Sequence, residues 1–204
     1  MRTIIKMKKI LLAVALLVFP VLAFSAEYSI DPNHSSAQFT VRHLMVSNVK
    51  GAFSKVTGTV NFDPNNLATS TVDATIDVST VDTRQPQRDA DLRSPNFFDV
   101  EKFPTMTFKS KQFYREGNQL KVKGDLTLHG VTKEVVLDVD GPSPEVKDPW
   151  GNQRVGASIS TKINRHDWGL NYSKMVEAGA VVGDEITINI DLEATKKKAE
   201  AAAK

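Results

Sequence analysis

The chain is 204 residues long and contains no cysteine, which excludes disulfide bonds, thiolate metal sites, thiol catalysis and lipid attachment at an N-terminal cysteine. Its formal net charge is +2, but residues 1–26 hold four basic residues and no acidic ones, so the remainder has 22 Lys plus Arg against 24 Asp plus Glu. This weak acidity, without a basic stripe, argues against nucleic acid as a partner and against electrostatic adhesion to anionic lipid.

The first 26 residues have the three zones of a secretory signal. A basic start precedes an apolar run over residues 10–24, and small residues follow at the exit. An uncleaved membrane anchor is the alternative, but the run is short and Pro20 interrupts it. The sequence therefore predicts that residues 1–26 are a cleaved export signal, with cleavage after Ser25 favoured over cleavage after Ala26.

Beyond residue 26 the dominant pattern is an alternation of apolar and polar residues with period two, which predicts β-strands with one buried face. Residues 71–78 show it clearly, since Val72, Ala74 and Ile76 alternate with polar neighbours. In chain order, the eight predicted strands lie at residues 37–41, 56–62, 71–78, 106–108, 120–128, 131–139, 155–163 and 185–192. Turn-forming residues separate most of them.

Eight amphipathic strands joined mostly by short turns favour an all-β fold, a closed antiparallel β-barrel, because closure removes exposed sheet edges. A two-sheet sandwich is the next choice. An outer-membrane barrel would require aromatic girdles at two heights, and the aromatic residues do not fall at regular strand ends. No low-complexity linker divides the chain, so we expect one domain over residues 27–193, followed by a flexible tail rich in Lys and Ala over residues 194–204.

One segment does not fit a strand. Residues 84–94 are rich in charge, are preceded by a capping residue at Thr83 and are stopped by Pro95, which predicts a short helix. The Asp89 and Asp91 pair is expected on its solvated face. Three phenylalanines follow, at positions 97, 98 and 103, and they form either a plug that closes one barrel end or a lip that touches a ligand.

An eight-stranded barrel is just wide enough either to fill itself with side chains or to hold one small ligand. Several inward positions are small, namely Ala37, Gly58, Ala74, Gly124 and Ala157. These residues either leave an apolar cavity or merely relieve crowding and allow strands to bend, and both interpretations stay open.

Catalytic chemistry has no local support. The four histidines lack the spacing of a helical zinc motif, and no serine-hydrolase elbow is present. His43 shares the inward parity of Phe39, so it either contacts a ligand head group or is a hydrogen-bonded core histidine. Arg165 and Asp167 could orient a ligand head group that Trp168 covers; alternatively, Arg165 pairs with a carboxylate and Trp168 seals the barrel end.

The chain resembles the YceI-like family, and the match covers essentially all of residues 27–193. The fragments that carry it are, in order, Asp31–Ser35 with Phe39 and His43, Gly51–Phe53, Ser79–Thr83, Arg88, Asp89, Leu92–Ser94, Phe97, Phe98, Phe103, Pro104, Gly124–Thr132, Asp148–Gly151, Arg165 and Asp167–Gly169. The resemblance implies a lipocalin-like barrel in the periplasm that binds a polyisoprenoid or another long-chain amphiphile and needs no cofactor. Asp91 stands where the family commonly has a histidine, which puts a head-group role at that position in doubt.

Together these arguments predict a carrier or scavenger of apolar molecules. An enzyme acting on a lipid head group, and an adaptor for a redox partner in the inner membrane, are the alternatives, and a homodimer stays open. No catalytic residue, metal ligand or cofactor is assigned. The predicted ligand-binding residues are Phe39, Val41, His43, Phe53, Ala74, Ile76, Phe97, Phe98, Phe108, Ala157, Arg165, Asp167 and Trp168.

Overall fold

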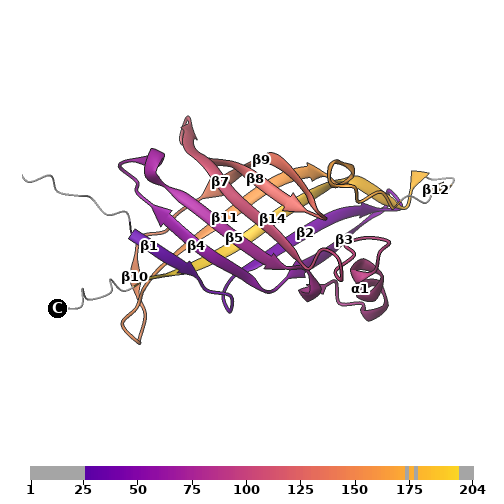
Figure 1. Cartoon of the computed structure of the whole chain (residues 1–204), viewed down its shortest axis with the longest axis horizontal. Coiled ribbons are helices and arrows are strands. Elements are labelled where there is room, and N and C mark those ends of the chain that lie inside the picture. Colours follow the sequence, from indigo (N-terminus) through magenta and orange to yellow (C-terminus); the bar gives the residue numbers. More distant parts are fainter. Residues whose placement is uncertain (1–25, 173–174, 177–178, 198–204) are drawn as a thin grey trace, which may run out of the picture.

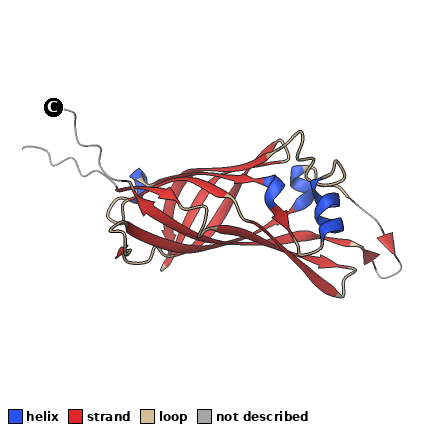
Figure 2. Cartoon of the chain, turned by 90° about the horizontal axis from the view of Figure 1, so that it is seen from below, coloured by secondary structure: helices blue, strands red, loops and turns tan. Residues whose placement is uncertain are grey.

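The computed structural model describes residues 26–172, 175–176 and 179–197, and strands dominate it (Figures 1 and 2). In chain order the strands are β1 (Ala26–Ile30), β2 (Ser36–His43), β3 (Ser47–Phe53), β4 (Val56–Phe62), β5 (Thr71–Asp77), β6 (Val81–Asp82), β7 (Thr105–Glu116), β8 (Gln119–Leu128), β9 (Val131–Asp140), β10 (Val146–Lys147), β11 (Gln153–Asn164), β12 (Met175–Val176), β13 (Gly179–Ala180) and β14 (Val182–Lys196). The helical elements are α1 (Pro86–Arg93) and the short 3-10 turns η1 (Leu67–Thr69), η2 (Val78–Thr80) and η3 (Arg165–Trp168).

The last strand closes the sheet into a barrel. One edge of β14 pairs with β11, and the other edge pairs first with β2 and then with β1. Strands β1 and β2 therefore follow one another along a single edge, and β3 and β4 do the same on the next one. The result is a closed, eight-stranded antiparallel barrel, as predicted, and each of the eight predicted strands is present.

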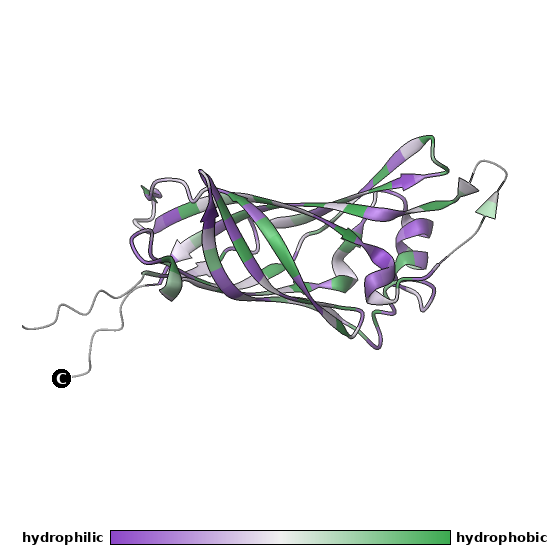
Figure 3. Cartoon of the chain, turned by 90° about the horizontal axis from the view of Figure 1, so that it is seen from above, coloured by the Kyte–Doolittle hydropathy of each residue, from purple (hydrophilic) through white to green (hydrophobic). Residues whose placement is uncertain are grey.

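Hydrophilic and hydrophobic residues alternate along the strands (Figure 3). Because successive side chains of a strand point to opposite faces, this alternation gives the wall an apolar and a polar side. Along β14, Ile186 and Ile188 pair with Val41 and Phe39 of β2, and all four pack in or against the core or line its cavity. The intervening residues carry polar groups outward, where Lys162 of β11 pairs with Glu185 at 2.8 Å. Such exposed ion pairs contribute little to stability, so the apolar face determines the fold.

Strands β9 and β11 are neighbours in the wall but pair over a short stretch only. Their register covers only residues 138–140 and 158–160. One further bond follows, from Thr161 Oγ1 to the carbonyl of Val136 at 2.9 Å. Beyond it, η3 fills the gap, because Trp168 Nε1 donates to the Leu126 carbonyl at 3.2 Å and Lys133 pairs with Asp167 at 2.9 Å. A buried tryptophan thus replaces the missing ladder.

The predicted helix is present but is shorter than expected. Gln85, rather than Thr83, caps it by accepting a hydrogen bond from the Arg88 amide at 2.6 Å. Thr83 instead donates its amide to Asp89 Oδ1 at 2.9 Å, and its hydroxyl bonds to the same oxygen. Asp89 is therefore buried and not on a solvated face, whereas Asp91 is exposed. The buried amide and hydroxyl of Thr83 both require an acceptor, which explains why the carboxylate turns inward.

The barrel includes residues on both sides of the predicted domain boundaries. Strand β1 begins at Ala26, the last residue of the predicted signal, and residues 1–25 lie outside the described residues. The tail was predicted to start at residue 194, but β14 continues to Lys196 and Ala194 is buried against β1 and β11. Residues 198–204 also lie outside the described range. Among the described helices, none has the length and apolar character needed to cross a membrane.

Candidate functional site

An apolar cavity of about 290 Å³ lies inside the barrel. Residues from one end of the wall to the other line it, from Tyr28 and Pro142 near β1 to Phe97 and Val182 near α1. Aliphatic and aromatic side chains make up most of this lining, and Arg165 is the one charged residue among the described lining residues. Such a lining excludes polar solutes and favours a hydrophobic guest.

Two packed regions flank the cavity. The larger one gathers Phe53, Val78, Val81 and Trp168 near the α1 end, and the smaller one gathers Phe113, Leu120, Val122 and Leu137 near the opposite end. Val135 packs against both regions and Phe108 against the smaller one, and each is only partly buried. Members of both regions also line the cavity, so packed side chains and open space share the same lumen.

Ten of the thirteen predicted ligand-binding residues line this cavity. They come from seven strands or connecting segments and are Phe39, Val41, Phe53, Ala74, Ile76, Phe97, Phe98, Phe108, Ala157 and Arg165. Inward parity on a strand was sufficient to find most of them, because successive side chains point to opposite faces. Their contact with a ligand stays a prediction.

The other three predicted residues do not line the cavity. His43 is the last residue of β2 and is paired with Ser47 beyond the cavity wall. Asp167 is exposed and bonded to Lys133, and Trp168 is buried in the wall with its indole nitrogen on the Leu126 carbonyl. The 3-10 turn explains the error, because it rotates Asp167 outward and Trp168 into the β9–β11 gap. Trp168 therefore seals the barrel, which was the structural alternative.

The small inward residues have two different roles. Ala37, Ala74 and Ala157 line the cavity and leave it room. Gly58 and Gly124 are instead required by the wall itself. A Cβ on Gly58 would clash with the backbone of Ala74 at 2.8 Å, and its φ of +144° suits only glycine; one on Gly124 would lie 2.5 Å from the Lys109 carbonyl.

The phenylalanines after α1 close the cavity and also contribute to its lining. Phe98 packs edge-on against Phe53 at 5.6 Å, and Phe97 stacks on Tyr172 at 4.5 Å. Both phenylalanines line the cavity. The two predicted roles, a plug that closes the barrel end and a lip that touches a ligand, therefore fall on the same two side chains. The third, Phe103, packs on His129 outside the cavity.

Arg165 joins three segments at the α1 end. Its guanidinium donates to the carbonyl of Gly183 at 2.9 Å and of Leu170 at 2.5 Å, and it pairs with Asp184 at 3.2 Å. Asp184 also accepts from His166 Nε2 at 2.8 Å when that nitrogen is protonated. These bonds compensate the buried charge and fix the rim of the cavity.

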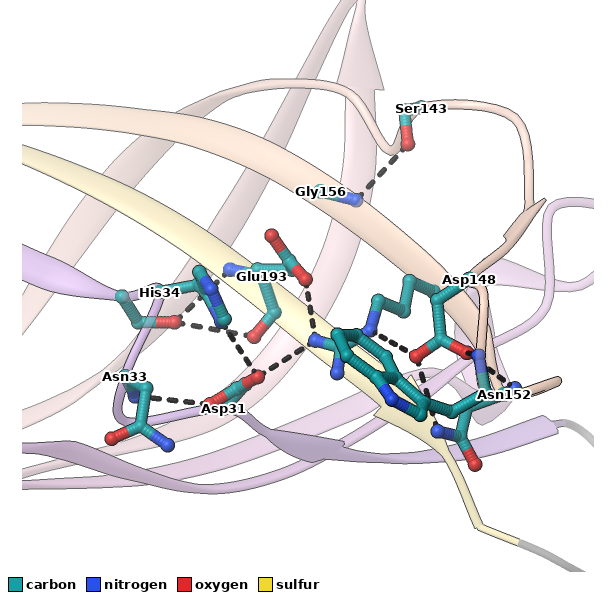
Figure 4. Close-up of polar contacts among 11 residues, drawn as sticks. Asp31, Asn33, His34, Ser143, Asp148, Asn152, Gly156 and Glu193 are labelled. Atoms are coloured by element: carbon teal, nitrogen blue, oxygen red, sulfur yellow. Dashed lines mark hydrogen bonds and ion pairs between the residues drawn. The ribbon is translucent and has the colours of Figure 1, made fainter.

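A charged cluster that the sequence analysis did not predict ties the other end together (Figure 4). Arg154 on β11 bonds to Asp31 at 2.7 Å, to Asp148 at 2.8 Å and to Glu193 at 2.5 Å. The Arg154 guanidinium, assisted by His34, lowers the pKa of Asp31 to about 2, and it also lowers the pKa of Asp148. The cluster links four segments across the β1–β14–β11 closure.

This cluster is structural in its chemistry. Ligand atoms of Asp31, His34 and Glu193 lie within 4.8 Å of one another, a spacing compatible with a cation site. Arg154 Nη1, however, already contacts both carboxylates and supplies the positive charge there. Two fragments of the family resemblance, Asp31–Ser35 and Asp148–Gly151, meet here, although they lie more than a hundred residues apart in the sequence.

A closed antiparallel barrel with a continuous apolar lumen defines a class of protein, the small barrels that enclose a hydrophobic ligand. The chain belongs to the YceI-like family, because the model of the YceI-like domain matches residues 28–194. The fold and the family expected from the sequence are thus confirmed. Asp91, the position at which the resemblance implied a histidine, lies on α1 and is not among the residues that line the cavity.

Known proteins support the assignment. A UPF0312 protein of Vibrio cholerae is 42% identical over 170 residues, which cover 80% of this chain and 89% of the relative. The crystal structure of the Campylobacter jejuni YceI protein is 34% identical, has a TM-score of 0.64, and the match covers 76% of this chain and 90% of that one. A domain from Saccharophagus degradans, described as polyisoprenoid-binding, shares the fold at 17% identity with a TM-score of 0.61, over 85% of this chain and 99% of that one.

Proposed function

We propose that the protein binds a long-chain apolar or amphiphilic molecule, such as a polyisoprenoid, an isoprenoid quinone or a similar lipid, and carries or sequesters it in the periplasm. The observation that carries this proposal is the apolar cavity within the barrel. Membership of the YceI-like family and the described ligand class of the Saccharophagus degradans domain support lipid binding in general.

The shape of the cavity favours a chain over a compact ligand. Strand β14 has 15 residues. At about 3.3 Å per residue and a tilt of about 40°, such a strand spans on the order of 35–40 Å of the barrel axis. The lining residues are distributed along much of that length, and each methylene buried there contributes about 0.8 kcal/mol. A linear chain of repeated apolar units gains most from such a space.

No catalytic step is included in the proposal. An enzyme acting on a lipid head group would have used His43, Arg165 or Asp167, but only Arg165 reaches the cavity lining, and its guanidinium is engaged by carbonyl groups. The family is one of binding domains.

Lipid extraction followed by mass spectrometry tests the binding. Protein purified without detergent should release a stoichiometric, chemically intact long-chain lipid, and delipidated protein should bind an added isoprenoid quinone. A purified protein that releases no lipid and does not bind the quinone would refute the proposal. Release of a modified form of an added lipid would favour the enzymatic alternative.

The location rests on the predicted signal. Cleavage after Ser25 would keep the whole of β1, whereas cleavage after Ala26 would remove its first residue. Protein recovered from a periplasmic extract should therefore have an intact mass that starts at Ala26 or Glu27. A mass that retains the apolar run of residues 10–24, found in a membrane fraction, would contradict export by a cleaved signal.

A further inference from the structure

Three exposed apolar side chains gather on two neighbouring hairpins beyond the α1 end of the barrel. Met45 and Val46, at the turn between β2 and β3, are 51% and 72% exposed, and Met175 on β12 is 70% exposed. The Leu44 amide donates to the Val181 carbonyl at 2.9 Å, which joins the two hairpins. Figure 1 shows β12 at this extremity, away from β1 and β10. We name the described residues 42–47, 175–176 and 179–181 the hairpin tip.

The β2–β3 turn presents its apolar side chains in a fixed way. Leu44 and Met45 both adopt positive φ values, 48° and 58°, which non-glycine residues rarely adopt. Arg42 holds this conformation, since its guanidinium donates to the Met45 carbonyl at 2.9 Å and to Asn48 Oδ1 at 3.3 Å. An unfavourable backbone braced by an arginine keeps two apolar side chains in solvent.

The charge around this turn is positive. Between residues 42 and 50 the ionisable side chains are Arg42, His43 and Lys50, and none is acidic. The turn is therefore locally basic. The net charge near −2 of the chain beyond residue 26 argues against adhesion of the whole surface to anionic lipid, but not against a local contact at this turn. Exposed apolar residues with basic neighbours suit the surface of a bilayer that contains anionic lipid.

The tip continues directly from the cavity wall. Val41 and Val182 both line the cavity, and Val182 pairs with His43, which is two residues before Met45. At about 3.3 Å per strand residue, Met45 lies on the order of 10–15 Å beyond Val41. A membrane contact at the tip would bring the apolar lumen next to the lipid phase.

We propose that the hairpin tip inserts its apolar side chains into the surface of an anionic phospholipid bilayer, so that the ligand exchanges between bilayer and cavity at this end. The inference rests on the proposed function for its purpose, but the contact itself can be measured without ligand. The contact is weak and reversible, because three side chains and two basic groups are too few for stable anchoring.

Vesicle flotation tests the contact. The wild-type protein should float with vesicles of phosphatidylethanolamine and phosphatidylglycerol and should float less in high salt, which screens the basic groups. The Val46→Asp variant should lose flotation. The matched control is Val146→Asp, since Val146 is 61% exposed on β10 at the opposite end, and this variant should float like the wild type.

Two further measurements separate the explanations. Melting temperature and quinone binding from ethanol solution should be unchanged in both variants, because neither residue lines the cavity. Equal flotation of Val46→Asp and wild type, or equal loss in Val146→Asp, would overturn the proposal. A wild-type dimer in solution that Val46→Asp converts to a monomer would make the tip an interface between two copies instead. Failure of quinone binding in every sample would refute the proposed function, while flotation would still decide the contact.

Discussion

The ring of Phe39 covers Gly51 on the neighbouring strand, where a Cβ atom on the glycine would lie 2.6 Å from Phe39 Cε1. Phe108 covers Gly124 in the same way, with 2.6 Å between the corresponding Cβ position and Cζ. In both pairs the ring occupies the space of a missing side chain instead of the middle of the lumen. Pairing an inward aromatic residue with a glycine therefore leaves space in the cavity and still keeps the barrel wall well packed.

Replacing Gly51 with alanine should displace the Phe39 ring into the lumen. The atoms that a Cβ would meet belong to the side chains of Phe39 and Thr83, which can move, and not to the backbone. We expect a destabilisation of about 1–3 kcal/mol and a reduced affinity for an added isoprenoid quinone. Gly156→Ala is the control, because the nearest atom there is the Leu192 carbonyl oxygen at 3.4 Å. Unchanged affinity in Gly51→Ala would contradict this view of the wall.

Ala74→Phe tests whether the lumen is occupied by ligand. Ala74 lies between Gly58 and Phe108 on the adjacent strands and lines the cavity. In a tunnel, the added ring takes space that the ligand used, so delipidated protein should keep its melting temperature while the lipid that copurifies falls steeply. In a filled core the same ring would instead cost about 1–3 kcal/mol.

The control for Ala74→Phe is Thr75→Phe on the same strand. Thr75 has the opposite parity and faces outward, so its lipid content should match that of the wild type. A large loss of melting temperature in Ala74→Phe with normal lipid content would place Ala74 in a packed core.

The Arg154 cluster should make barrel stability depend on acid. The pKa of Asp31 is lowered from 3.8 to about 2 by Arg154, and that of Asp148 is lowered by the same guanidinium. Groups with depressed pKa values stabilise the folded state above the unfolded pKa, and this contribution is lost as pH falls toward the folded pKa. The free energy of unfolding should therefore decline between about pH 4 and pH 2.

Arg154→Met removes the cause of both pKa shifts. Urea unfolding followed at several pH values should show the largest difference between wild type and variant above pH 4, with the difference narrowing as the carboxylates become protonated. A difference that stays constant down to pH 2 would mean that these carboxylates titrate alike in the folded and unfolded states.

Asp89 and Asp91 offer a matched pair on one helix. Asp89→Ala leaves the buried amide and hydroxyl of Thr83 without their acceptor, which should cost about 1–3 kcal/mol. Asp91→Ala, at an exposed position, should change stability by no more than about 0.5 kcal/mol. Chemical denaturation measures both. Similar losses in the two variants would show that burial of Asp89 is not what stabilises this segment.

Much of the fold could be predicted from the sequence because period-two alternation directly encodes which face of a strand is buried. Two of the strands that were not predicted, β1 and β3, have a local reason. Strand β1 is five residues long and adjoins the signal, and β3 carries Asn48, Lys50 and Gly51, which weaken the pattern. The need for glycine at position 51 follows only from the fold, because the Phe39 ring on the neighbouring strand occupies the place of a side chain there.

The lining of the cavity could be predicted by the same parity argument, whereas the polar contacts at the barrel ends could not. Arg154 meets Asp31 only because β14 brings β1 and β11 together, a relationship that no local pattern contains. Likewise, Trp168 leaves the cavity because η3 turns it into a gap between strands whose position depends on the closed barrel.

The pairing of β14 with β1, β2 and β11 also sets the order in which the protein can fold. Ribosomes make the chain from its N-terminus, so β1 and β2 cannot pair with β14 until about 150 further residues have been made. Hairpins such as β7–β8 can form early, because their strands are adjacent in sequence, but ring closure is a late and strongly non-local event. Until Lys196 has emerged, the apolar faces of the earlier strands remain exposed, and the nascent chain needs protection from aggregation for that whole interval.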